Sequence, residues 1–164
     1  MLIRTPLLVA ALAALTTAPS LTRSTPEPCT TATAACERWV TLGGGPARSM
    51  VYATYALDKR NTSITRALIM VHGADRNADH YFETATAAGF LAGALGNTII
   101  IAPRFAAGKD TVAANEVVWP SRGDSWRSGG MSPTNPTLSS FDLADEMLRE
   151  LANKKLFPNL THIV

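Results

Sequence analysis

Apolar runs alternate with polar, turn-forming segments along most of this chain. Residues 50–57 are rich in β-branched and aromatic side chains, and residues 67–71 and 98–102 are continuous apolar runs typical of strands covered on both faces. Residues 43–46, which read Gly-Gly-Gly-Pro, predict a turn before the first strand. Pro103 closes the last run, because proline has no backbone N–H to donate to a central ladder.

Two segments carry apolar residues at helical spacing. Residues 79–95 predict a helix that stops at Gly96 and Asn97. A second helix is expected to begin at Ser139, which can cap its first amides, with Asp142 three residues later to complete a capping box. Its expected core face contains Leu143, Met147, Leu148 and Leu151.

Buried strands that alternate with amphipathic helices predict an α/β fold with mostly parallel strands and flanking helices. Residues 157–159 break the second helix, and the strand that begins at Leu160 is expected in the centre of the sheet. Residues 104–138 have no clear periodicity. A connection of that length predicts a functional surface loop.

The amino-terminal part of the chain has a different composition. Residues 1–20 contain Arg4, an apolar run over residues 7–15 and small residues up to Ser20, the order typical of a secretory signal peptide. The run is shorter than the ~20 residues that cross a bilayer, so we expect a secreted, periplasmic or extracellular protein without a membrane span after cleavage. Residues 21–36, rich in Thr, Pro and Ala, predict a flexible leader.

Cysteine usage and charge narrow the possible partners. Cys29 and Cys36 are the only cysteines, and export favours a local disulfide between them over two free thiols. Neither has a histidine close by in sequence, so we expect no metal site, and nothing indicates a cofactor. The 15 basic and 13 acidic residues are scattered, which argues against a nucleic-acid partner.

The segment after residues 67–71 resembles the oxyanion loop of α/β-hydrolases. Residues 72–82 read His-Gly-Ala-Asp-Arg-Asn-Ala-Asp-His-Tyr-Phe, and with residues 98–103 and 139–160 they resemble secreted microbial and fungal serine hydrolases of that superfamily. The resemblance covers residues 39–164 and rests on the order of several segments. It implies a partial α/β-hydrolase domain over residues 37–164, from a serine carboxylic ester hydrolase that acts on small-molecule or polymer esters.

The same resemblance implies an oxyanion hole at Gly73 and Ala74. The backbone N–H of Ala74 would face the oxygen that becomes negative when an acyl carbon turns tetrahedral. His72, which precedes this pair, is a candidate for the substrate cleft. The alternative for His72 is a structural role, in which its ring nitrogens hold the loop by hydrogen bonds.

The family places its nucleophilic serine in a G-x-S-x-G turn after the strand that follows the second helix, with the acid and the histidine later in the chain. His72, His80 and His162 all precede that point. The resemblance therefore implies that the nucleophile, acid and base lie beyond Val164 and that the chain stops before the nucleophile elbow. We expect this chain alone to be inactive.

The long loop offers other candidates. Residues 123–125 read Gly-Asp-Ser, as in a box of another esterase family, but no strand leads into the triplet. Trp119 and Trp126 either line a substrate cleft or anchor the loop to the core. An alternative to the hydrolase is a secreted, non-catalytic module that uses the loop from Trp119 to Trp126 to hold a glycan or peptide. A further alternative is a gene product that does not fold stably.

Overall fold

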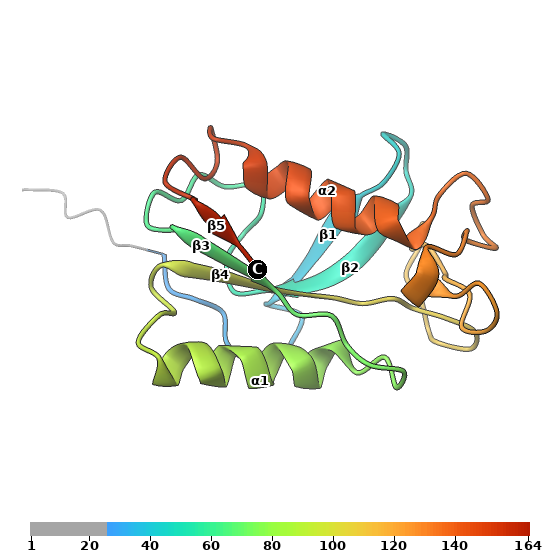
Figure 1. Ribbon diagram of the computed structural model, residues 1–164, viewed down its shortest axis with the longest axis horizontal. Coiled ribbons are helices and arrows are strands. Elements are labelled where there is room, and N and C mark those ends of the chain that lie inside the picture. Colours follow the sequence, from blue (N-terminus) through green and yellow to red (C-terminus); the bar gives the residue numbers. More distant parts are fainter. Residues whose placement is uncertain (1–25) are drawn as a thin grey trace, which may run out of the picture.

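The structure, a computed structural model, describes residues 26–164, so the signal peptide expected over residues 1–20 lies outside the described part. One sheet is covered by α1 on one face and α2 on the other (Figure 1). The elements in chain order are β1 (Glu37–Thr41), β2 (Arg48–Ala53), β3 (Arg66–Ile69), α1 (Ala78–Leu91), β4 (Thr98–Pro103), the 3₁₀-helix η1 (Trp126–Ser128), α2 (Ser140–Ala152) and β5 (His162–Ile163).

The sheet is mixed, with the strand order β1-β2-β4-β3-β5. β1 pairs with β2 and β2 with β4 in antiparallel fashion, whereas β3 is parallel to both β4 and β5. The expectation of a mostly parallel α/β-hydrolase sheet is therefore wrong, because two of the four described strand pairs are antiparallel and only two α-helices flank the described sheet. The short turn between Thr41 and Arg48 leaves no room for a crossover helix, so β1 and β2 form a hairpin.

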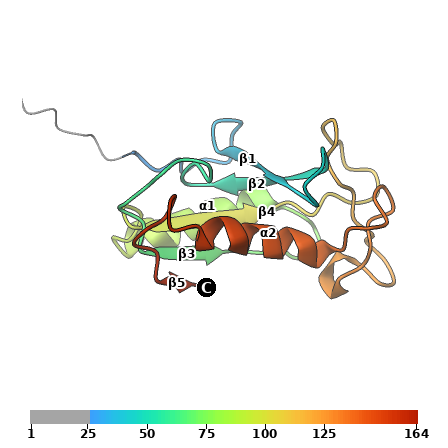
Figure 2. The ribbon, with the colours of Figure 1, turned by 90° about the horizontal axis from the view of Figure 1, so that it is seen from above.

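β5 occupies one edge of the described sheet, which corrects the central position expected for the strand that begins at Leu160 (Figure 2). Its two residues are exposed. The N–H of Thr161 donates to Thr65 O at 3.0 Å and that of Val164 to Ala67 O at 3.0 Å, both toward β3. Within residues 26–164 no strand pairs with the outer side of β5.

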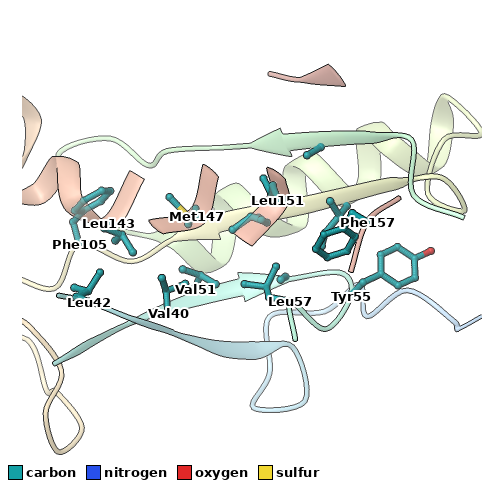
Figure 3. Packing of buried hydrophobic residues seen from close by; sticks show 14 of the residues in the cluster. Val40, Leu42, Val51, Tyr55, Leu57, Phe105, Leu143, Met147, Leu151 and Phe157 are labelled. Atoms are coloured by element: carbon teal, nitrogen blue, oxygen red, sulfur yellow. The ribbon is translucent and has the colours of Figure 1, made fainter. Parts of the chain in front are cut away.

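The core lies between the sheet and α2. Leu143, Met147 and Leu151 point from α2 toward the sheet, where Val40 of β1 and Val51 of β2 meet them (Figure 3). Burial of each such side chain contributes about 2 kcal/mol relative to exposure. Leu148, expected on the same face, is exposed instead.

Of the flexible leader expected over residues 21–36, residues 21–25 lie outside the described part, and residues 26–36 are held against the rest of the protein. Cys29 and Cys36 form the disulfide that the sequence favours. The N–H of Cys29 donates to Thr54 O at 2.7 Å, and that of Ala32 donates to the Glu83 carboxylate at 3.2 Å. Cys36 is completely buried beside α1 and β4, so covalent and hydrogen-bonding constraints order a segment whose composition alone does not.

Candidate functional site

Two loops meet beyond the carboxyl ends of the parallel strands β3 and β4. The segment after β3 runs past the end of the sheet before it turns back into α1, and the long loop of residues 104–138 gathers at the same end (Figure 1). This edge is where ligands bind in open α/β sheets. A hollow of about 300 Å³ borders the first loop and is lined by Met70, Asn77, His80, Tyr81 and Thr84.

His72 fixes the start of the β3–α1 loop. Its side chain is nearly inaccessible, with 3% of the residue exposed. Nε2 accepts a hydrogen bond from the Phe105 N–H at 3.1 Å, so Nδ1 carries the proton and donates to Gly73 O at 2.8 Å. Burial lowers the pKa of His72, because the charged form loses hydration. With both nitrogens occupied, His72 holds the loop and is not placed to act as a base.

The direction of the Ala74 N–H follows from the bonds to its peptide plane. Gly73 O accepts from His72 Nδ1 and from the Arg76 N–H, the latter at 3.1 Å. In a trans peptide the N–H points opposite to the C=O, so the Ala74 N–H points away from these two donors. Ala74 is exposed, and its N–H donates to no acceptor among residues 26–164.

An ion pair joins the β3–α1 loop to the long loop. The Arg76 guanidinium binds the Asp110 carboxylate through two hydrogen bonds of 2.9 and 3.1 Å, and Nη1 of Arg76 donates to Ala74 O at 3.3 Å. The same carboxylate accepts the Ala107 N–H at 2.9 Å. The hydrogen bond from Arg76 lowers the pKa of Asp110, so the pair is ionised at neutral pH.

No pattern in the sequence indicates that Arg76 and Asp110 form a pair. Arg76 adopts a left-handed conformation with φ 56°, which is uncommon for a residue with a side chain. Asp110 follows 34 positions later in a loop without periodicity, so no local pattern joins the two residues.

Trp119 and Trp126, the other cleft candidates, lie in the core. They are 1% and 7% exposed. The ring of Trp126 stacks on Phe105 with centroids 5.0 Å apart and meets the His72 ring edge-on at 4.9 Å. This burial favours the alternative interpretation, in which both tryptophans anchor the long loop. The long loop therefore packs, through Trp126, against His72 at the start of the β3–α1 loop.

The serines of the long loop have structural contacts. Ser125 is buried, and its Oγ accepts from Arg127 Nε at 3.4 Å. Gly130 has to lack a side chain, because a Cβ there would come within 1.8 Å of Asp124 O. Within residues 26–164 no serine hydroxyl is hydrogen-bonded to a histidine: His80 lies near Asp79, and His162 contacts Thr161.

Two observations concern the environment of the protein. The Cys29–Cys36 disulfide is compatible with an extracellular or other oxidising compartment. Over residues 26–164, no helix has the length and apolar character needed to cross a bilayer. The same residues contain no cluster of three or more His, Cys, Asp or Glu side chains suited to a metal ion.

No protein-family model, curated protein or solved structure matches this chain. The similarity of residues 72–82 to hydrolase oxyanion loops therefore remains a hypothesis that rests on the residues and on the geometry of the loop.

Proposed function

We propose that this chain supplies the oxyanion-binding loop of an exported serine carboxylic ester hydrolase. The nucleophile, base and acid would come from sequence outside residues 1–164. One observation carries the proposal: the Ala74 N–H is unpartnered among the described residues and faces away from the groups that hold Gly73 O. The proposal rests on this loop and not on the arrangement of the sheet.

The chemistry needs a donor that is already oriented. When a nucleophile adds to an ester carbonyl, the carbonyl oxygen becomes negative and gains most from N–H groups aimed at its final position. His72 and Arg76 hold the peptide before the reaction, so no reorganisation is required. A single donor of this kind is worth about 3 kcal/mol of transition-state stabilisation.

The chain alone should not turn over esters. A serine needs a base that takes its proton, and residues 26–164 contain no hydrogen-bonded serine–histidine pair. The binding-module alternative uses the loop from Trp119 to Trp126 to hold a glycan or peptide. Since Trp119 and Trp126 are buried, no specific observation favours that alternative.

The test compares the 164-residue chain with the protein isolated from its source. Each is treated with a fluorophosphonate probe and assayed with p-nitrophenyl acetate. We expect the natural protein to be labelled on a serine outside residues 1–164 and to hydrolyse the ester, while the 164-residue chain does neither. Labelling of Ser125 with turnover abolished by Ser125→Ala, or an unlabelled and inactive natural protein, would overturn the proposal.

A further inference from the structure

Tyr81 brings a hydroxyl group to the backbone of the β3–α1 loop. It is the fourth residue of α1 and lines the hollow beside the loop. A Cβ built on Gly73 would lie 3.1 Å from Tyr81 Oη, a tighter contact than most Cβ atoms make. The missing side chain of Gly73 thus leaves space for this hydroxyl, one residue from the Ala74 amide.

The hydroxyl of Tyr81 has no hydrogen-bond partner among the described residues. By comparison, Tyr55 is buried, and its Oη donates a hydrogen bond to Leu95 O at 2.8 Å. Tyr81 Oη makes no hydrogen bond to any of residues 26–164, and Tyr81 is half-buried at the hollow. A phenol in this position can donate to an oxygen atom that enters the hollow.

We infer that Tyr81 Oη is a second donor to the developing oxyanion and hence a catalytic residue, an inference that rests on the proposed function. As the nucleophile's oxygen bonds to the acyl carbon, the carbonyl π electrons move onto the carbonyl oxygen. Tyr81 and the Ala74 N–H each donate a hydrogen bond to that oxygen, and Tyr81 keeps its proton. The base that took the proton of the nucleophile then gives it to the alcohol oxygen, as the electron pair re-forms the carbonyl and the bond from the acyl carbon to the alcohol oxygen breaks.

This pair of donors suits a small acyl group. Hydrogen bonds to an ionised oxygen are shorter and stronger than those to a neutral one, so both donors gain most in the tetrahedral state. The hollow that Tyr81 lines has a volume of about 300 Å³, and Met70 supplies an apolar wall against which an acyl chain can pack. The substrate class is therefore an ester with a short, uncharged acyl part.

The experiment uses the ¹⁵N-labelled 164-residue chain and dimethylphosphinate, a tetrahedral monoanion. The Ala74 amide resonance is followed during titration, with sodium chloride at equal ionic strength as the reference. We expect saturable binding that Tyr81→Phe weakens about tenfold, as for loss of a hydrogen bond to a charged group. Tyr52→Phe is the matched control, since it removes a phenol that lines a different hollow, and should leave the affinity unchanged.

The outcomes separate this inference from the proposed function. Saturable binding that Tyr81→Phe does not weaken would overturn the role of Tyr81 and leave the Ala74 amide as donor. Absence of saturable binding at Ala74 would overturn both. If Tyr81→Phe fails to fold, 3-fluorotyrosine at position 81 provides the second measurement: its ¹⁹F resonance must shift with the same affinity as Ala74, and a resonance that does not respond would exclude Tyr81.

Discussion

Glu150 is a carboxyl group in surroundings that oppose its charge. It lies half-buried on α2, and its Oε2 has no hydrogen-bond partner among the described residues. Burial is the main cause that raises the pKa of Glu150 from 4.5 to about 7, and the neighbouring carboxylates of Glu146 and Asp58 contribute to the same shift. The side chain therefore binds its proton more tightly in the folded protein than in the unfolded chain.

This difference predicts how stability depends on pH. The folded pKa of Glu150 is above the unfolded value, so the free energy of unfolding should fall as pH rises from 4.5 to about 7 and change little from this group above that. Glu150→Gln should remove the decline and stabilise the protein by about 1 kcal/mol at pH 8, after allowance for solvent screening of a half-buried group. Urea unfolding at several pH values measures both effects. Asp145→Asn, which removes an exposed carboxylate of the same helix that is not a cause of the Glu150 shift, serves as the control, and a parallel decline in wild type and Glu150→Gln would contradict the assignment.

The contacts of single residues also show which roles could not be predicted from the sequence. Gly73 was predictable as a loop glycine, but the nearest group to its absent side chain is Tyr81 Oη, which no pattern in the sequence indicates. The tautomer of His72 depends on the Phe105 N–H, 33 positions away. Roles that are set by contacts between distant segments need the folded chain.

α2 begins where the capping residues in the sequence predict a helix. The Asp142 carboxylate accepts the Ser139 N–H at 2.6 Å, one half of the expected capping box, and α2 begins at the next residue. Asp142→Ala should remove this bond and a negative charge near the helix N-terminus, and lower the free energy of unfolding by about 1 kcal/mol. Chemical denaturation provides the measurement. Asp145→Ala, at an exposed position of the same helix, should cost much less, and equal losses would argue against the cap.

Other elements differ from expectation at their ends, for local reasons. α1 stops at Leu91 and not at residue 95, because Gly93 adopts φ 62° and donates its N–H to Phe90 O. β2 ends at Ala53, since the Thr54 hydroxyl accepts the Ile100 N–H at 2.9 Å in place of a backbone carbonyl. Periodicity identifies an element, whereas a side chain or a glycine conformation determines where it ends.

β1 shows what periodicity overlooks. Its sequence Glu-Arg-Trp-Val-Thr has only one fully buried residue, Val40, so it lacks the apolar run that identified β3 and β4. Trp39, Val40 and Thr41 have high strand propensity, and the glycine-rich turn that follows them was the available signal for a hairpin. Strands at the edge of a sheet have weaker patterns because one side of them meets solvent.

The order of the strands in the sheet could not be predicted from the sequence. β3 and β4, which the sequence predicts as buried strands, are parallel neighbours, with Ala67 opposite Ile99. The antiparallel pairing of β2 with β4 joins residues about 50 positions apart, such as Tyr52 and Ala102, and depends on the hairpin with β1. The position of the β3–α1 loop beyond the carboxyl end of β3 depends only on the parallel pair of β3 and β4.

The edge formed by β5 gives the last prediction. Ile163 is 40% exposed and Val164 81% exposed on a strand that pairs on one side only within the described sheet. Exposed apolar edge strands pair with other chains, and a lysine on the edge prevents this. Ile163→Lys should therefore reduce concentration-dependent association of the 164-residue chain, measured by light scattering between about 10 and 200 μM, in the micromolar range where such edges associate. Its thermal midpoint should change little, because Ile163 contributes nothing to the buried clusters.

Val112→Lys introduces the same charge at another exposed apolar position, away from the sheet edge, and should leave association unchanged. Equal suppression by both variants would show that net charge, and not the open edge of β5, controls association.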